Sequence, residues 1–262
     1  MLNRRTPAVL VLEDGSIFNG SAFAGHGSSF GEVVFNTGMT GYQEILTDPS
    51  YKEQILVMTY PLIGTYGINT EDMESGGIHM EGFVIREYQD FYSNWRASTT
   101  LRSFLEDHGK IGIEGIDTRA VTRRIRSRGA MRGVVSTFVD RVDDLLEEVR
   151  AYPGLVGRDS VTGVSCRQAY TWKEGAVIEA NSFPPKGQRF RVAVLDCGVK
   201  RSILRCLEIK GCEVIVVPAT TSPQEVLNLE PDGVVLSNGP GDPAPLKGIV
   251  DTVRVLLGKQ PL

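Results

Sequence analysis

The stretch Ser-Asn-Gly-Pro-Gly-Asp-Pro-Ala-Pro, residues 237–245, places two glycines among prolines directly after a run of residues typical of a buried strand. Glycine permits backbone angles closed to other residues and lets a substrate approach main-chain N–H groups. Such donors stabilise the negative oxygen that develops when a carbonyl is attacked. Ligands of open parallel sheets collect at the carboxyl ends of strands. We therefore interpret Gly239 and Gly241 as parts of a ligand-binding loop, with a plain turn as the alternative.

The two familiar phosphate-binding glycine motifs do not occur in this chain. The pattern G-x-x-x-x-G-K-[ST] is missing, and G-x-G-x-x-G nowhere follows a predicted strand. The sequence therefore gives poor support for nucleotide binding by this chain itself.

Two side chains could act as nucleophiles on paper. Residues 27–31 fit the pattern G-x-S-x-G around Ser29, but that elbow requires a helix after the serine, and the residues that follow predict a strand. Cys197 lies just past a predicted strand, where an exposed thiol could attack a carbonyl. The neighbouring Asp196 disfavours a thiolate, and no histidine follows His108. We favour a structural role for Cys197 and disfavour a serine hydrolase.

The cysteines and histidines do not have the spacing of a metal site. The four cysteines lack C-x-x-C spacing, and the three histidines are scattered singly. We expect no metal site and mostly buried, reduced thiols. These residues are Cys166, Cys197, Cys206, Cys212, His26, His79 and His108.

Six arginines are concentrated in and just after one predicted helix. Because the apolar positions of this helix are Val121 and Ile125, most of the arginines are expected to face water. A protein interface is the second interpretation, and a nucleic-acid site the third. The six are Arg119, Arg123, Arg124, Arg126, Arg128 and Arg132.

The overall composition is that of an ordinary globular protein. Hydrophobic residues make up 41% of the 262 residues, and 28 basic residues against 32 acidic ones leave a net charge of -4. This balance gives no general attraction to nucleic acid or anionic lipid. The apolar run at residues 8–12 is too short for a signal peptide, and no segment reaches the roughly 20 apolar residues of a membrane span. We expect a soluble, cytoplasmic chain.

The elements that must position these residues divide the chain into two domains. Residues 1–151 predict a strand-rich domain in which helices come late. Residues 8–18 predict two strands joined by an Asp-Gly turn, and further strands are predicted at 31–38, 53–64 and 82–88. The predicted helices cover 99–109, 117–129 and 140–151, with Asp117 starting the second helix and Gly129 ending it.

The second half has a different pattern. Residues 152–190 are rich in Gly, Pro, Ser and Thr, and the stretch "FPPKGQRF" near their end favours an extended, structureless run. We interpret 152–190 as the connection between domains. After it, strands and helices alternate, which favours a parallel sheet covered on both faces. The predicted strands are 191–196, 212–219 and 232–239, and the predicted helices are 200–211, 222–229 and 251–258. We interpret 191–262 as part of a doubly wound domain, so the fold class is α/β.

Several stretches resemble the small, glutamine-hydrolysing subunit of carbamoyl phosphate synthetase, in order and over nearly the whole chain. The most specific are "GEVVFNTGMTGYQEILTDPSYKEQILVMTYPLIG" and "DGVVLSNGPGDPAP". The matching stretches are 31–64, 116–133, 152–159, 192–207 and 232–245.

The resemblance implies an N-terminal swivelling β/β/α domain followed by the first half of a flavodoxin-like class I glutamine amidotransferase domain. A cysteine of such domains attacks the side-chain amide of glutamine, assisted by a histidine and a glutamate. The ammonia passes to a large subunit, which uses bicarbonate, ATP and Mg to make carbamoyl phosphate for pyrimidine and arginine synthesis. The resemblance thus implies a heterodimer, with no cofactor in this chain.

Three residues can be matched to the glutamine site of the family. Gly239 and Gly241 would bind glutamine and stabilise the tetrahedral oxyanion. Ser50, in the stretch "LTDPSY", would reach the glutamine from the other domain, so the site would lie in the cleft between domains.

The catalytic residues of the family are not among those matched. Its G-I-C-L-G-H-Q type motif is expected just after Pro261 and Leu262. We therefore expect the Cys/His/Glu triad to lie beyond Leu262 and this chain to be inactive alone, because nucleophile and base act as a unit. The alternative is a non-catalytic docking module for the large subunit.

Overall fold

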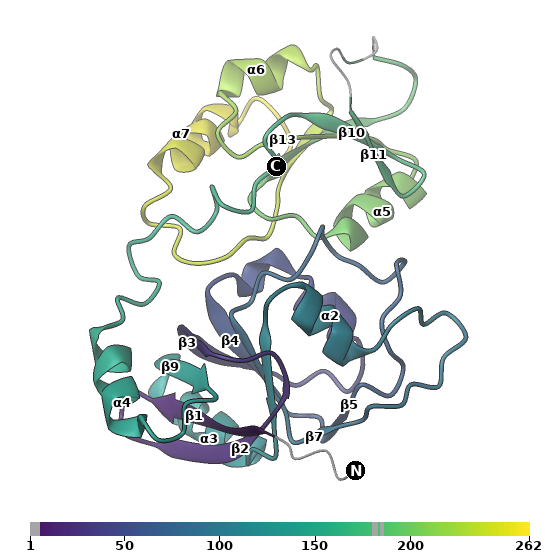
Figure 1. Cartoon of the computed structure of the whole chain (residues 1–262). Coiled ribbons are helices and arrows are strands. Elements are labelled where there is room, and N and C mark those ends of the chain that lie inside the picture. The colour runs from purple at the N-terminus through teal and green to yellow at the C-terminus, as the bar shows by residue number, and fades with distance from the viewer. Residues whose placement is uncertain (1–5, 180–182, 184–185) are drawn as a thin grey trace. The chain divides into compact units, whose positions relative to one another are not determined.

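The computed structural model describes residues 6–179, 183 and 186–262 of the chain (Figure 1). The chain forms two compact units. The first, called the barrel unit, comprises residues 1–47 and 51–154. The second, called the sheet unit, comprises residues 155–262 together with the short segment Asp48–Ser50.

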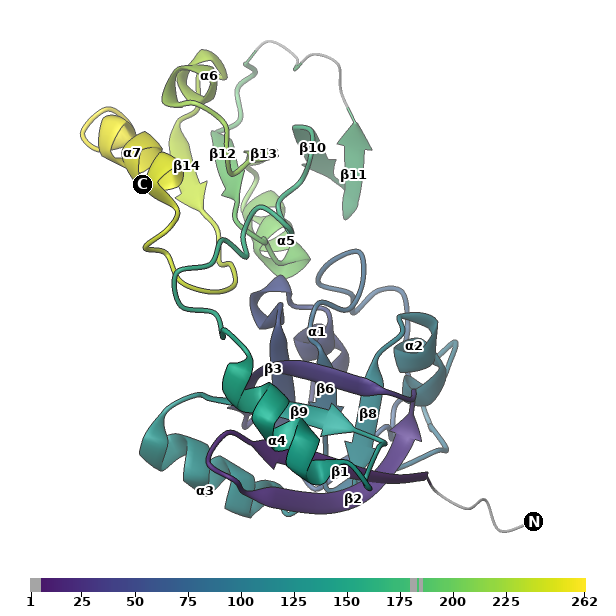
Figure 2. The same cartoon turned by 60° about the vertical axis from the view of Figure 1, so that its left-hand side comes forward.

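The barrel unit is built around a closed barrel of seven strands (Figure 2). Neighbours β3, β4, β6 and β8 are parallel, and the other pairs are antiparallel. In barrel order the strands are β1 (Thr6–Leu12), β2 (Ile17–Ala24), β8 (Ile111–Glu114), β6 (Gly82–Val84), β4 (Gln54–Met58), β3 (Ser28–Asn36) and β9 (Met131–Ser136).

Strand β1 shows how the sequence closes this barrel. Its residues 8–12 are all apolar and all buried, because side chains alternate between two covered faces. Leu10 and Leu12 point into the cluster that fills the barrel. Val9 and Val11 pack instead against Leu145 and Val149 of helix α4 (Val142–Ala151). The helix predicted over residues 140–151 is confirmed, and it begins two residues later, at Val142.

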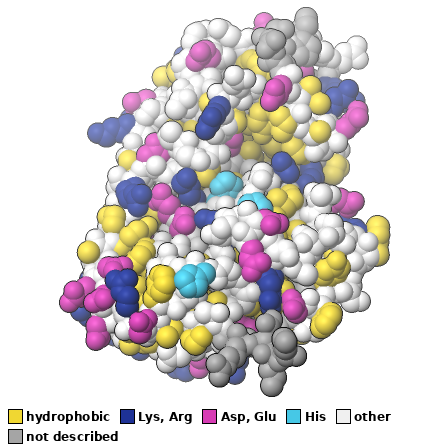
Figure 3. Space-filling model, viewed as in Figure 1, with side chains coloured by type: hydrophobic (Ala, Val, Ile, Leu, Met, Phe, Trp, Pro, Cys, Tyr) yellow, Lys and Arg dark blue, Asp and Glu magenta, His cyan; other side chains and the backbone are white. Residues whose placement is uncertain are grey.

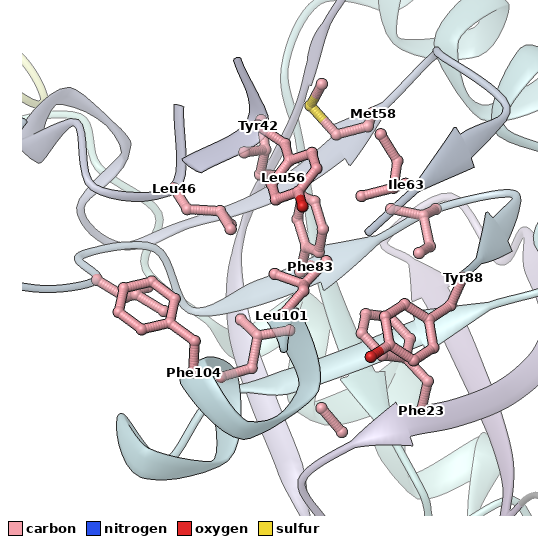
Figure 4. Packing of buried hydrophobic residues seen from close by; sticks show 14 of the residues in the cluster. Phe23, Tyr42, Leu46, Leu56, Met58, Ile63, Phe83, Tyr88, Leu101 and Phe104 are labelled. Atoms are coloured by element: carbon pink, nitrogen blue, oxygen red, sulfur yellow. The ribbon is translucent and has the colours of Figure 1, made fainter. Parts of the chain in front are cut away.

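A second apolar cluster lies on the side of the barrel that carries helix α2 (Leu101–Asp107). Figure 4 shows Leu56, Phe83 and Leu101 converging there. Tyr42 stacks on Tyr66 with ring centroids 4.0 Å apart, and the Tyr42 hydroxyl donates to the Gly67 carbonyl at 2.7 Å. Short elements complete this side: α1 (Tyr42–Leu46), η1 (Pro49–Tyr51), β5 (Leu62–Ile63) and β7 (Glu87–Tyr88).

Helix α3 (Thr118–Arg128) begins and ends where the sequence predicts. The Asp117 carboxylate accepts a hydrogen bond from the Ala120 N–H at 2.9 Å, which caps the first turn. Gly129 ends the helix with φ 90°. Val121 and Ile125 are buried, and most of the arginines are exposed, as expected.

The sheet unit contains five strands, in the order β11-β10-β13-β12-β14. The three predicted strands are confirmed and pair in parallel. Strands β10 and β11 add an antiparallel hairpin to the edge of β13. The bounds are β10 (Tyr170–Lys173), β11 (Ala176–Glu179), β12 (Arg191–Asp196), β13 (Glu213–Pro218) and β14 (Gly233–Leu236).

The hairpin corrects the interpretation of residues 152–190 as a connection between domains, because part of this stretch belongs to the sheet. Glu174 and Gly175 form its two-residue turn, with φ of 52° and 74°. Positive φ at both positions is the turn geometry that matches the twist of two antiparallel strands. Trp172 is buried against the sheet, which fixes the hairpin there. Residues 180–182 and 184–185 of the predicted linker lie outside the described residues.

Helices cover both faces of this sheet, as predicted for a doubly wound arrangement (Figure 2). Helices α6 (Pro223–Asn228) and α7 (Lys247–Leu256) pack on one face through Val226 and Leu256. Helix α5 (Arg201–Ile209) packs on the other face through Leu204. Helix α7 starts four residues before the predicted position 251, because Ile249 and Val250 already belong to its apolar face.

The charged side chains are mixed on the surface (Figure 3), as the near balance of basic and acidic residues leads one to expect. On the face drawn in Figure 3, basic and acidic side chains are interspersed over both units. Within the described residues, no helix combines the length and the apolar character needed to cross a membrane.

Candidate functional site

The loop at residues 237–246 joins β14 to α7 at the carboxyl end of the parallel strands, where the sequence places it. Its first residue, Ser237, is hydrogen-bonded to β12 and to Cys197, the residue that follows β12. The Ser237 N–H donates to the Leu195 carbonyl at 3.2 Å, and the Cys197 N–H donates to the Ser237 hydroxyl at 2.9 Å. The start of the loop is therefore held against the end of the neighbouring strand.

The two glycines have different structural reasons to be glycine. A Cβ added to Gly239 would lie 2.1 Å from the Cys197 carbonyl oxygen, so no other residue fits without moving the backbone. Gly241 has φ +74°, a left-handed conformation that favours glycine. The side of Gly239 that lacks a Cβ is thus filled by the backbone at Cys197. Our interpretation from sequence had explained the glycine by the approach of a substrate to main-chain N–H groups.

The amides of the same two glycines remain available to a ligand. Among the described residues, none accepts a hydrogen bond from the N–H of Gly239 or Gly241. Backbone donors without a partner inside the protein must be solvated or must bind a ligand. The loop therefore offers two N–H donors beside a cavity.

Asn238 is the functional candidate that the sequence analysis missed. Its Nδ2 donates to the Ser50 hydroxyl at 2.9 Å and to the Gly198 carbonyl at 3.0 Å. Its Oδ1 accepts from the Lys200 N–H at 3.3 Å. The sequence signal that could have identified Asn238 as a site residue was its place in the loop, between Ser237 and Gly239.

Ser50 is brought to this loop by the short segment Asp48–Ser50. We expected Ser50 to reach the site from the first domain, whereas the structure groups this segment with the sheet unit. The Asp48 carboxylate accepts from the Ser50 N–H at 2.9 Å, and Pro49 lies against Gly198. Ser50 and the glycine loop thus belong to one compact body.

The tip of the loop is fixed by Asp242. One carboxylate oxygen accepts from the Ala244 N–H at 2.8 Å, and the other accepts from the Gly157 N–H at 3.0 Å. These two bonds lower the pKa of Asp242 below its usual value, the bond from Ala244 most. The loop is therefore tied to the segment that contains Gly157.

A cavity of about 410 Å³ opens between this loop and α7. Gly239 and Gly241 line it, but Ser50 does not. Its wall is mostly apolar, and Arg254 is the one charged residue among those that line it. The remaining residues are Val161, Cys197, Leu236, Ser237, Pro240, Pro243, Leu246, Ile249, Val250 and Val253.

The carboxylate of Asp196 organises the end of β12. Asp196 is buried, and its two oxygens accept hydrogen bonds from the N–H groups of Gly198, Val199 and Cys166 at 2.8 to 2.9 Å. Buried carboxylates require such donors because they have lost water. Asp196 thus joins β12 to the start of α5 and to the segment around Cys166.

The thiols near Asp196 are poor nucleophiles. Burial raises the pKa of Cys197 to about 11, and the negative charge of Asp196 adds to the rise. Burial and the same carboxylate raise the pKa of Cys166 to about 12. Although Cys197 stands at a strand-to-helix corner, its thiol stays protonated near neutral pH. This supports the structural role that we favoured from sequence.

The other chemistries weighed from sequence find no support. Ser29 lies inside β3 rather than before a helix, so the context of a serine nucleophile is absent. No group of three or more His, Cys, Asp or Glu side chains among the described residues could hold a metal ion.

Comparison with known proteins decides the family. The model for the CPSase domain of the carbamoyl-phosphate synthase small chain matches residues 10–135, and the model for class I glutamine amidotransferases matches residues 193–262. The carbamoyl phosphate synthase small chain of Syntrophotalea carbinolica is 51% identical over 257 residues, covering 97% of this chain and 68% of that relative. The chain belongs to the carbamoyl phosphate synthase small chain family.

Other members of the family are similarly close. The carbamoyl phosphate synthase small chain of Synechocystis is 48% identical, covering 98% of this chain and 68% of the relative. That of Nitratidesulfovibrio vulgaris is 47% identical, covering 97% and 69%. The matched CPSase domain corresponds to most of the barrel unit, and the matched amidotransferase domain runs from β12 through the glycine loop and α7.

The raised thiol pKa values predict selective alkylation. At pH 8 a thiol of pKa 11 is ionised in about one molecule in a thousand, so Cys197 and Cys166 should react with iodoacetamide about tenfold or more slower than the exposed Cys206. Mass spectrometry of timed samples measures each rate. Equal rates at Cys197 and Cys206 would contradict the pKa argument.

The packing of Gly239 predicts a structural cost on substitution. Gly239→Ala should lower the free energy of unfolding by about 1 to 3 kcal/mol, because the new Cβ meets a backbone carbonyl. Gly248→Ala, in α7 with open space around it, is the matched control and should raise stability by about 0.5 to 1 kcal/mol. Urea denaturation measures both, and an unchanged Gly239→Ala would refute the close approach.

Proposed function

We propose that the glycine loop binds the side-chain amide of glutamine and that the N–H groups of Gly239 and Gly241 stabilise the oxyanion formed when this amide is attacked. The observation that carries the proposal is the pair of N–H donors for which no described residue is an acceptor, set beside a cavity at the carboxyl end of parallel strands. Donors fixed in advance cost no reorganisation during the reaction.

Ser50 has a supporting role in this proposal. Its hydroxyl accepts a hydrogen bond from Asn238, which leaves the hydroxyl proton free to be donated to a carboxylate or carbonyl oxygen of glutamine. Asn238 then acts as a positioning residue, because it fixes Ser50 relative to the loop that contains Gly239 and Gly241.

The four cysteines of residues 1–262 are not proposed as the attacking group. Cys166 and Cys197 have raised pKa values, and a thioester requires a thiolate. Cys206 lies on α5 and Cys212 just after it, and neither lines the cavity beside the loop. We propose that this chain alone binds glutamine without hydrolysing it at an appreciable rate.

The proposed fate of the ammonia is based on the family to which the chain belongs. The names of the relatives, small chain, imply a larger partner. We propose that ammonia released from glutamine passes to this large subunit, which makes carbamoyl phosphate from bicarbonate and ATP for pyrimidine and arginine synthesis. The docking-module hypothesis differs only in denying the sheet unit a role in glutamine binding.

Amide chemical shifts test the glutamine site directly. Adding L-glutamine to ¹⁵N-labelled protein should shift the Gly239 and Gly241 amide signals, whereas L-leucine should not, because its side chain has no amide oxygen to accept the N–H groups. Ser50→Ala should weaken binding by about threefold to tenfold. Ser127→Ala, on an exposed helix face, is the control. Glutamine binding that leaves both glycine amides unmoved would exclude the proposed site.

Ammonia release tests the statement about the thiols. The chain should produce no more ammonia from glutamine than a variant in which all four cysteines are replaced by serine, because no activated thiolate is present. A coupled glutamate dehydrogenase assay measures both proteins. Turnover that disappears in Cys197→Ser alone would show that Cys197 is the nucleophile after all.

A further inference from the structure

Helix α3 carries arginines on two faces, and in the described part of the chain only one of the faces is paired with an acidic side chain. Arg124 and Arg128 both donate to the carboxylate of Asp14, at 2.5 and 2.9 Å. Arg119, Arg123 and Arg126 follow one another at helical spacings of four and three, which places them on a common face. Within the described part of the chain, no ion pair joins these three guanidinium groups to an acidic residue.

The unpaired arginines line a cavity of about 450 Å³ together with three threonines. Thr37 and Thr59 directly follow the parallel strands β3 and β4, whose ends are in register at Asn36 and Met58. The Thr59 N–H donates to the Asn36 carbonyl at 3.1 Å, so the two loops lie together. The third hydroxyl, of Thr122, comes from α3 itself.

Two large apolar side chains stand beside these threonines in the chain. Met39 is 77% exposed and Tyr60 is 39% exposed. Arginine, tyrosine and methionine are enriched in protein–protein interfaces. A small phosphate ligand, by contrast, would need neither Met39 nor Tyr60. We call Arg119, Arg123, Arg126, Thr37 and Thr59 together the arginine face, and Met39 and Tyr60 are exposed apolar residues close to its threonines in the chain.

We propose that the arginine face is a docking surface for a carboxylate-bearing segment of a partner protein. The inference rests on the proposed function, in which that partner is the large subunit. Each guanidinium can hold a carboxylate through two parallel N–H bonds, and the hydroxyls of Thr37 and Thr59 can donate to the same oxygens, whereas the Thr122 hydroxyl already donates to the Thr118 carbonyl at 2.7 Å. Complementary charge of this kind accelerates association and excludes partners of the wrong sign.

A second exposed surface of the barrel unit provides a comparison. Phe91 is 83% exposed and Trp95 is 92% exposed. The neighbouring Arg96, however, is already bonded to Glu71 and Asp72, so its positive charge is not free to select an acidic partner.

The experiment measures binding of the complete large subunit to this chain by surface plasmon resonance. Arg119→Glu, Arg123→Glu and Arg126→Glu are combined in one variant. Lys173→Glu, Lys210→Glu and Lys259→Glu are combined in a control with the same change of charge on exposed sites elsewhere. We expect affinity to fall about 30-fold or more in the arginine variant and to change less than threefold in the control. Circular dichroism verifies that both variants stay folded.

The outcomes separate this inference from the function on which it rests. Absence of binding by the unmodified chain would contradict the proposed partner itself. Binding by the unmodified chain with no loss in the arginine variant would overturn the docking surface alone. So would a loss seen only when Phe91 and Trp95 are both changed to alanine. Saturable binding of inorganic pyrophosphate that the arginine variant abolishes, with subunit binding intact, would replace it by a phosphate site.

Discussion

The buried carboxylate of Asp196 is the interaction on which the site depends. A charge removed from water must be hydrogen-bonded, and Asp196 meets this requirement with three backbone N–H groups from two segments of the chain. Those bonds fix the backbone that follows β12, including the Cys197 carbonyl. Because that carbonyl lies where a side chain of residue 239 would be, the glycine loop has its shape only when the end of β12 is held this way.

The loop shows how one residue can meet a structural and a chemical requirement together. The missing side chain of Gly239 allows backbone to approach from one side, while its N–H stays without a partner among the described residues. Asn238, the residue before Gly239, donates hydrogen bonds to the Ser50 hydroxyl and the Gly198 carbonyl. The side chain of Asn238 thus stabilises the fold, and the main-chain donors are left for a ligand. Burial is the main reason that the pKa of the Cys197 thiol is raised, and the negative charge of Asp196 adds to it, so the thiol stays protonated near neutral pH. The burial that orders this region therefore also makes Cys197 a poor nucleophile.

The barrel unit makes a different use of its charges. Asp14 receives two arginines of α3, which fixes the helix on the barrel, while no ion pair in the described part of the chain joins the three arginines of the other face to an acidic residue. A chain of net charge -4 thus retains a local cationic surface. Composition alone could not reveal this, because net charge averages over faces that a helix separates.

The sequence by itself determined what depends on local pattern. The alternation of strands and helices after residue 190, the cap of α3 at Asp117 and the place of the loop after β14 all follow from periodicity and turn chemistry, and each is found in the structure. Family membership also follows from sequence, because long motifs are specific. Only the tertiary structure decided that Ser50 meets Asn238, 188 positions away, and that Gly239 is required by a carbonyl. It also decided that Tyr170–Lys173 joins the sheet. Such contacts depend on which segments the fold brings together, and no local preference of the chain encodes that.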